Sequence, residues 1–233
     1  MYQFKSRVRY SEVELDKKLD LSAIIDYFQD CSTFQSEDIG LSIDYLRSIN
    51  RAWVLSSWQI IVNDYPELGQ EITSSTWAYD FNGIYGYRNF MIENNQKEVL
   101  AYANSIWVYI DTKSGRPTRV TDDIANTYGL EEKIDMNYAP RKISFSKDMI
   151  SLAPFSVIRS NIDTNNHVNN GQYIKMAEEF LPEDFVIKQM RADYRKAARL
   201  DDLIVPKLAK IQDGYIVVLA DTEDKPFTII EFK

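Results

Sequence analysis

The chain has 233 residues, of which 45% are hydrophobic and 13% aromatic, and its formal net charge is −8. This composition is typical of a folded globular protein, and the acidic balance argues against a general nucleic-acid-binding surface. A single cysteine, Cys31, and a single histidine, His167, exclude an internal disulfide and a Cys/His zinc cluster.

The sequence shows no pattern that would direct the chain to a membrane or out of the cell. Residues 1–7 lack the apolar core of a secretion signal, and no apolar run approaches the ~20 residues that a transmembrane helix needs. A Gly-rich phosphate-binding loop is also missing from the sequence. We therefore expect a cytoplasmic protein with no membrane span, nucleic-acid partner, metal or cofactor.

The first half predicts one helix followed by a sheet. A helix is expected from Leu21, because Ile24, Phe28 and Cys31 recur at helical spacing and share one face. The runs that follow are rich in β-branched and aromatic residues and predict strands over residues 52–63, 71–80, 87–92 and 100–110. Residues 129–141 are the expected connection to the second half.

The second half repeats this order. A shift of 149 positions aligns residues 11–16 with 160–165, and 21–28 with 170–177, without a gap. The second helix places Tyr173, Ala177 and Phe180 on one face, and strands are predicted over residues 185–194, 203–211, 215–221 and 227–232. The sequence thus predicts an α+β protein formed by duplication, with one domain over residues 1–135 and another over residues 136–233.

The densest polar motif runs from Asp163 to Asn170 and contains the only histidine. Histidine exchanges protons near neutral pH, and the neighbouring carboxamides can hold the imidazole or a carbonyl group. A helix-capping turn would explain the asparagines alone, but it explains the carboxylate and the imidazole less well. In the first half, Lys18 stands at the position of His167 and Leu21 at that of Asn170. Only the second half is therefore predicted to be catalytic.

The polar motif also carries a family resemblance. Asp163-x-Asn165-x-His167-Val168-Asn169-Asn170, with Tyr173, resembles the catalytic segment of fatty acyl-ACP thioesterases. Segments of the first half resemble the same family, namely residues 66–72, Thr76-Trp77, Arg88, residues 105–111 and residues 114–119. The resemblance implies two tandem hotdog domains, each an antiparallel sheet wrapped around a central helix, with acyl-chain binding in the first.

The resemblance also implies an activity. The expected reaction is hydrolysis of the thioester of fatty acyl-acyl carrier protein, so the expected partner is acyl carrier protein with its acyl-phosphopantetheine. The family's motif assigns catalysis to Asp163, Asn165 and His167. For such a reaction, His167 or Asp163 would act as general base towards water. The helix N-terminus at Asn169, Asn170 and Gly171 would stabilise the oxyanion, although an N-cap role is favoured for Asn169 itself.

One position departs from the family. A glutamate is usual after a Tyr-Arg pair on the strand that follows the helix, and here Ala197 stands in its place. Three explanations are open at this stage. Asp163 shares the acid–base work with His167, or another acid such as Asp193 or Glu178 is recruited, or the activity is low.

Basic residues crowd the same stretch, as Lys188, Arg191, Arg195, Lys196 and Arg199. They could dock an acidic carrier, or they could be the solvated charges of a strand edge. Three functions therefore remain: an acyl-ACP thioesterase, an acyl-CoA thioesterase, and an acyl-binding protein without turnover. Both a monomer and a homodimer fit the sequence.

Overall fold

The computed structural model describes residues 1–146 and 148–233. They divide into two compact units. Unit 1 comprises residues 1–56 and 60–139, and unit 2 comprises residues 57–59 and 140–233. Within the described residues, no helix is both long enough and apolar enough to cross a membrane.

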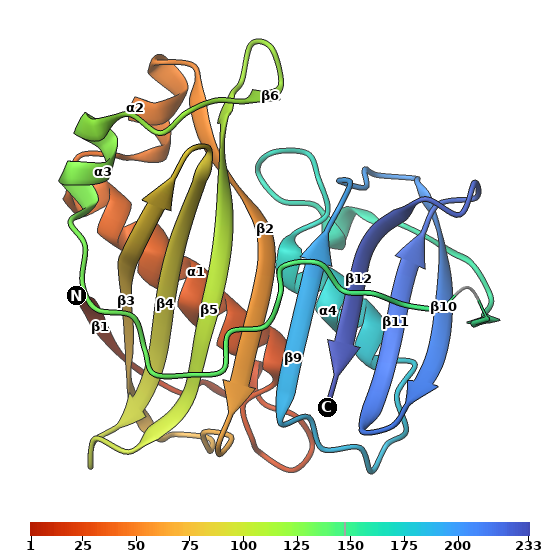
Figure 1. Ribbon diagram of the computed structural model, residues 1–233. Helices are drawn as coiled ribbons and strands as arrows, with labels where there is room; N and C mark the ends of the chain where they lie inside the picture. Colours follow the sequence, from red (N-terminus) through yellow and green to blue (C-terminus); the bar gives the residue numbers. More distant parts are fainter. Residues whose placement is uncertain (147) are drawn as a thin grey trace. The chain divides into compact units, whose positions relative to one another are not determined.

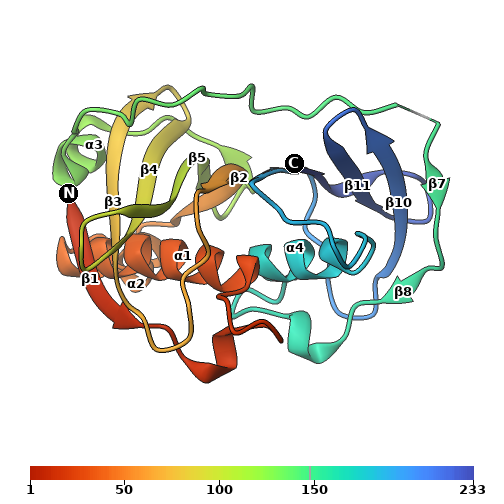
Figure 2. The ribbon, with the colours of Figure 1, turned by 90° about the horizontal axis from the view of Figure 1, so that it is seen from below.

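Unit 1 is a long helix on an antiparallel sheet. The helix is α1 (Leu21–Asp38), and the sheet order is β1 (Tyr2–Arg7), β3 (Glu71–Asn82), β4 (Tyr85–Asn94), β5 (Val99–Asp111) and β2 (Arg51–Val62). Figures 1 and 2 show α1 lying against one face of this sheet. The Asp20 carboxylate caps α1 by accepting the N–H of Ala23 at 2.5 Å, and Ile24, Phe28 and Cys31 are fully buried against the sheet side as predicted.

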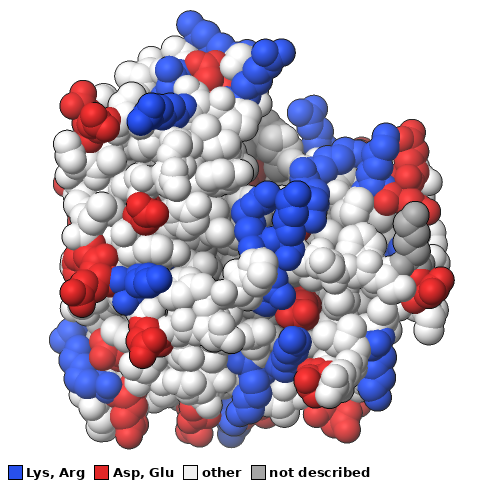
Figure 3. Space-filling model, viewed as in Figure 1, with Lys and Arg blue, Asp and Glu red and all other residues white. Residues whose placement is uncertain are grey.

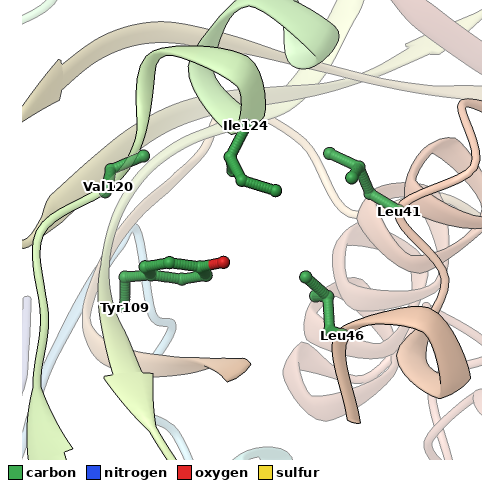
Figure 4. Close-up of a cluster of buried hydrophobic side chains, with 5 residues drawn as sticks. All are labelled: Leu41, Leu46, Tyr109, Val120 and Ile124. Atoms are coloured by element: carbon green, nitrogen blue, oxygen red, sulfur yellow. The ribbon is translucent and has the colours of Figure 1, made fainter. Parts of the chain in front are cut away.

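Shorter elements complete unit 1. They are the 3-10 turn η1 (Tyr10–Glu12), α2 (Ile43–Ser48), β6 (Arg116–Pro117) and α3 (Asp122–Tyr128). Helices α2 and α3 lie at one end of the unit (Figure 1) and enclose a cluster of buried apolar side chains. Figure 4 shows these side chains pointing toward one another; they are Leu41, Leu46, Tyr109, Val120 and Ile124.

Unit 2 repeats the plan with a shorter helix, α4 (Asn170–Glu178). Its sheet has the order β9 (Gln189–Tyr194), β12 (Pro226–Phe232), β11 (Gly214–Ala220), β10 (Leu203–Ile211) and β7 (Ile150–Ser151), and β8 (Phe155–Ser156) also pairs with β10. A second 3-10 turn, η2 (Arg159–Asn161), precedes α4. Figure 2 shows α4 on one face of this sheet. The prediction of two domains, each with a helix on an antiparallel sheet, is therefore confirmed.

The repeat extends to local detail. An isolated β-bridge joins Val13 to Leu19 before α1, and another joins Ile162 to Val168 before α4. The turns η1 and η2, the two bridges and the first residues of the two helices are all 149 positions apart. This equivalence confirms the duplication that the sequence alignment predicts.

Two predictions of strands need correction. The strand predicted from residue 185, β9, begins at Gln189, because the chain turns at residue 185 and the Phe185 N–H donates to the carbonyl of Pro182 at 3.0 Å. Strand β1 is missing from the prediction, although residues 2–7 pair in full with β3. Its side chains alternate between half-buried and exposed, so its apolar character is weak.

The connection contains no helix or strand from residue 129 to 149, apart from residue 147, which lies outside the described residues. In unit 1 it is held by Asn89, whose side-chain oxygen accepts from the Ile134 N–H and the Tyr138 hydroxyl, both at 3.1 Å. In unit 2 it crosses the sheet face opposite α4 (Figures 1 and 2), where the Ile143 N–H donates to Asp193 at 3.3 Å.

Candidate active site

The predicted catalytic residues lie on a tight loop between η2 and α4. The bridge between Ile162 and Val168 closes the loop, and the Asp163 N–H donates to the His167 carbonyl at 2.8 Å. Asn166 has a φ of 61°, a left-handed conformation that asparagine tolerates better than most residues. The left-handed backbone therefore accounts for the asparagine at position 166.

The Asp163 carboxylate organises this loop. Its Oδ1 accepts the backbone N–H groups of Asn165 at 2.7 Å and of His167 at 3.2 Å. Such Asx-type bonds fix a turn without help from secondary structure. Within the described chain, Oδ2 has no hydrogen-bond partner, so one carboxylate oxygen shapes the loop and the other is available for chemistry.

His167 is half-buried and Asn165 is exposed. The backbone of His167 is bonded to Asp163 at both its N–H and its carbonyl, which holds the residue in place. Its imidazole ring makes no hydrogen bond to any residue that the structure describes, so no side chain fixes the ring's proton on one nitrogen.

The N-terminus of α4 follows directly. Asn169 is the N-cap, as predicted, and its side-chain oxygen accepts the Gly171 N–H at 2.8 Å. An oxyanion could therefore reach the Gly171 N–H only by displacing the Asn169 side chain. This cap weakens the predicted oxyanion role of Asn169 and Gly171 and leaves Asn170, the first helical residue, as the favoured member of that group.

A second set of contacts ties the segment after β9 to this region. The Tyr173 hydroxyl accepts the Ala198 N–H at 2.7 Å, and the Ala198 carbonyl accepts the Val168 N–H at 2.9 Å. The Tyr194 hydroxyl donates to the Asn170 carbonyl at 3.1 Å. Sequence reasoning includes Tyr173 in the motif but assigns no function to Tyr194. Both tyrosines act here as supports of the loop and of α4.

Burial raises the pKa of Tyr173 to about 12, and the negative charges of Asp202 and Asp163 act in the same direction. The hydroxyl therefore stays protonated at neutral pH. It can serve as a hydrogen-bonding group but not as a base.

The two acids proposed to replace the missing glutamate lie in different surroundings. Ala197 itself is exposed. Asp193 is fully buried; its carboxylate pairs with Arg195 at 2.6 Å and accepts the Ile143 N–H, on the sheet face opposite α4. Glu178 is the last residue of α4, about 12 Å along the helix axis from Asn170. These contacts give no support to the recruitment of Asp193 or Glu178, which stays a prediction.

The basic cluster is mostly paired. Arg191 is nearly buried, bonds Glu231 at 3.1 Å and donates to the Pro140 carbonyl at 2.6 Å. Its guanidinium is thus engaged within unit 2, and its docking role stays a prediction. Arg195 pairs with Asp193 and Lys196 with Asp221 at 2.8 Å, although both remain accessible.

Arg199 is exposed and makes no ion pair with any described residue. Figure 3 shows Lys and Arg side chains gathered over the β9 side of unit 2. Of the predicted members of the cluster, Arg195, Lys196 and Arg199 are exposed. The described residues contain no group of three or more His, Cys, Asp or Glu side chains that could hold a metal ion.

Comparison with protein-family models gives two matches. Residues 1–128 match the acyl-ACP thioesterase N-terminal domain, and residues 145–228 match the acyl-ACP thioesterase C-terminal domain.

Curated relatives cover most of the chain. The chloroplastic oleoyl-acyl carrier protein thioesterase 2 of Arabidopsis thaliana is 26% identical over 227 residues, which cover 87% of this chain and 61% of that protein. The chloroplastic palmitoyl-acyl carrier protein thioesterase of Cuphea hookeriana is 23% identical over 254 residues, covering 94% of this chain and 61% of that protein. The chain therefore spans 61% of the length of these relatives. The cytoplasmic location expected from the sequence stays a prediction.

Solved structures match the fold. An acyl-ACP thioesterase from Bacteroides thetaiotaomicron has a TM-score of 0.90 at 20% identity, covering 99% of this chain and 96% of that one. The 12:0-ACP thioesterase from Umbellularia californica has a TM-score of 0.86 at 17% identity, covering 100% and 96%. At these identities the similarity establishes the two-domain fold and not the activity.

Proposed function

Because the chain belongs to the acyl-ACP thioesterase family, we propose that it hydrolyses the thioester of fatty acyl-acyl carrier protein and releases a fatty acid and the carrier thiol. The observation that carries the proposal is the loop that holds Asp163 and His167 directly before the N-terminus of α4. That arrangement brings a proton acceptor and a source of oxyanion stabilisation into one short segment.

In the proposed reaction, the His167 imidazole removes a proton from water, and the water oxygen attacks the thioester carbonyl carbon. The C–S bond then breaks, and the imidazolium returns the proton to the thiolate. A positioned general base of this kind contributes ~10²–10⁴-fold in rate. His167 is the better candidate for the base, because one oxygen of Asp163 is occupied by backbone donors. The remaining oxygen of Asp163 would stabilise the imidazolium that forms.

The N-terminus of α4 would stabilise the tetrahedral intermediate. Its first N–H groups and the positive end of its dipole favour an oxyanion. The Tyr194 hydroxyl supports this role, because its bond to the Asn170 carbonyl fixes the first turn of the helix. Asn165, exposed on the same loop, would bind the water or the substrate carbonyl.

The carrier and the acyl chain are assigned by the same reasoning. The accessible cations Arg195, Lys196 and Arg199 would contact an acidic carrier surface, which chiefly raises the association rate. Unit 1, in which Lys18 occupies the histidine position, would bind the acyl chain. The same cations could instead bind the phosphates of coenzyme A, which makes an acyl-CoA thioesterase the nearest alternative.

A second candidate function is acyl binding without turnover. Ala197 favours it, because this residue stands where the family usually has an acid. The intact set of Asp163, Asn165 and His167 favours hydrolysis, since a binding protein does not require a proton acceptor at that place.

The test is hydrolysis of acyl-ACP substrates of increasing chain length by the purified protein, with matched acyl-CoA esters in parallel. We expect turnover with a preference for acyl-ACP. Arg199→Glu should raise KM for acyl-ACP, because it reverses an accessible charge, and leave kcat unchanged. Turnover of acyl-CoA alone would assign the alternative thioesterase activity. Tight acyl binding without hydrolysis would assign the binding function.

A further inference from the structure

Two Asn-Gly pairs occur in the chain, Asn82-Gly83 and Asn170-Gly171. An asparagine before glycine is open to chemical modification, because glycine has no Cβ to hinder the approach of its backbone nitrogen to the asparagine side chain. The first pair lies at the turn between β3 and β4 in unit 1, and the second begins α4 in unit 2. The same dipeptide is thus held in two different backbone settings.

The modification is loss of the side-chain amide, and it needs only water. The backbone nitrogen of the glycine gives its proton to solvent base and attacks the side-chain carbonyl carbon of the asparagine. The bond from that carbon to the amide nitrogen breaks, and ammonia leaves. Water then opens the resulting five-membered succinimide ring. Breaking the newly formed C–N bond gives aspartate, whereas breaking the original peptide bond gives isoaspartate, whose main chain is one carbon longer.

The setting of Asn82 permits this attack. The peptide group between the two residues must rotate to bring the nitrogen to the side chain, so bonds held by that group oppose the reaction. Asn82 is exposed and forms with Tyr85 the last pair of the β3–β4 ladder, where opening costs least. The Gly83 N–H donates to no residue in the described chain. No atom beyond its chain neighbours lies within 4 Å of the place of a Cβ at Gly83. The attacking nitrogen is therefore unrestrained.

The setting of Asn170 opposes the attack. The Asn169 side-chain oxygen accepts the Gly171 N–H at 2.8 Å, and the Tyr194 hydroxyl donates to the Asn170 carbonyl at 3.1 Å. Both polar groups of the peptide between Asn170 and Gly171 are thus bonded, and Gly171 is buried in the first turn of α4. Rotation of this peptide group would break both bonds and unwind the start of the helix.

Isoaspartate at position 82 would disturb the turn that follows. The carbonyls of Gly83 and Ile84 accept the N–H groups of Val120 and Tyr109, both at 2.9 Å. Val120 and Tyr109 belong to the apolar cluster of Figure 4. Only two residues separate the paired Asn82 and Tyr85, so an extra main-chain carbon cannot be absorbed without moving these carbonyls.

We propose that Asn82 is a site of spontaneous deamidation, that isoaspartate formed there weakens the two bonds to Val120 and Tyr109, and that the Asn169 cap and Tyr194 protect Asn170 from the same reaction. Deamidation is independent of the proposed hydrolysis, because no acyl substrate takes part in it.

The first test compares the two asparagines in one sample. The purified protein is kept at mildly alkaline pH, folded or in urea, and digested with trypsin at intervals for mass spectrometry. Trypsin releases residues 52–88 and 160–175, and fragment masses locate the modified residue. In the folded protein, Asn82 should react at least about tenfold faster than Asn170, the factor expected from two hydrogen bonds. In urea the two rates should be similar.

Equal rates in the folded protein, or no reaction of Asn82 there, would overturn the proposal. The same ratio of rates in urea would overturn the protection of Asn170 by the fold.

A substitution at the cap tests the protection directly. Asn169→Ala removes the acceptor of the Gly171 N–H and should speed the reaction of Asn170 about fivefold. Asn95→Ala removes the same side chain from unit 1, where it donates to Glu71, and should leave Asn170 unchanged. An unchanged rate at Asn170 in folded Asn169→Ala would overturn the role of the cap. If that variant fails to fold, the comparison of folded and urea-treated protein decides.

Hydrogen exchange tests the effect on the turn. The fraction that carries isoaspartate has one more negative charge and is separated by ion exchange. Its Tyr109 and Val120 N–H groups should exchange faster than in fresh protein, because their acceptors have moved. Asn82→Asp adds the same charge with a normal main chain and should exchange as fresh protein does. Equal exchange in the isoaspartate fraction and in fresh protein would overturn the predicted change in the turn.

Discussion

The loops before α1 and α4 have the same backbone and different side chains. The Glu14 N–H donates to the Lys18 carbonyl at 2.9 Å, and the Asp163 N–H donates to the His167 carbonyl at 2.8 Å. Lys17 and Asn166, at equivalent positions, have φ angles of 66° and 61°. The loop backbone therefore does not distinguish a catalytic site from a structural connection. The side chains at two or three positions make that difference.

The side-chain bonds inside the two loops differ in the way that the proposed chemistry requires. Before α1, the Asp16 carboxylate accepts the Lys18 N–H at 3.0 Å. Before α4, the N–H of His167, the residue equivalent to Lys18, donates to the Asp163 carboxylate. Asp163 lies two positions before Asn165, the residue equivalent to Asp16. The N–H at this position is thus accepted by a carboxylate at a different place in each loop, and Asn165 stands at the position of Asp16.

The largest expected effect comes from comparing His167→Ala with Lys18→Ala. Loss of the proposed general base should lower kcat for acyl-ACP by ~10²–10⁴-fold. Lys18→Ala removes the side chain at the equivalent position and should leave kcat unchanged, because unit 1 has no proton acceptor there. Steady-state hydrolysis of one acyl-ACP by both variants gives the answer. Similar losses in the two variants would mean that His167 acts only through the loop's shape.

Pro66 and Ala198 show that the two units satisfy backbone hydrogen bonds next to these loops in different ways. The carbonyls of Pro66 and Ala198 accept equivalent bonds, from Leu19 at 2.7 Å and from Val168 at 2.9 Å. Ala198 also has an N–H, which needs the Tyr173 hydroxyl as acceptor. Proline has no N–H, and the helix position equivalent to Tyr173 is Ile24, which has no hydroxyl.

Tyr173→Phe should therefore leave the Ala198 N–H buried without a partner and lower the free energy of unfolding by ~1–3 kcal/mol. Adding Ala198→Pro, which reproduces the arrangement of unit 1, should recover part of that loss. Urea denaturation of the two single variants and the double variant measures the coupling. Additive losses would show that the bond between Tyr173 and Ala198 contributes little to stability.

Sequence reasoning located the loop because its composition is unusual. A lone histidine among asparagines, directly before the second apolar helix, can be recognised from the sequence alone. The ion-pair partners of the basic side chains cannot be predicted from the sequence. Arg191 appears in sequence as a free cation, and it is paired with Glu231 because β9 and β12 are neighbours only in the folded sheet.

The same limit applies to the acids and to Arg88. Asp193 is four residues from Ala197, yet it faces the connecting segment and not α4, since alternate residues of a strand point to opposite faces. Arg88 is noticed in sequence only as part of the resemblance. Its burial depends on α1, β3 and α3, which are distant along the chain.

A smaller effect is expected when the missing acid is restored. Ala197 is exposed, so Ala197→Glu should be accommodated without repacking. If the position carries a proton or orients water in this protein too, kcat should rise roughly tenfold, a modest value for an acid–base group. Ala197→Gln has the same size and no charge, and should not raise kcat. An equal rise in both variants would indicate a packing effect and not acid–base chemistry.

The smallest effect concerns stability at high pH. It arises from Tyr173, which can ionise, whereas Ile24, its equivalent in unit 1, cannot. Burial raises the pKa of Tyr173 from 10.0 to about 12, so the folded protein keeps a proton that the unfolded chain loses between those values. The unfolded state then binds fewer protons, and the free energy of unfolding falls as pH rises from 10 to 12. Tyr173→Phe should remove this component, because phenylalanine does not titrate. Urea denaturation of both proteins between pH 9 and 12 should therefore give curves that converge as pH rises. Parallel curves would show that the Tyr173 hydroxyl titrates alike in the folded and unfolded chains.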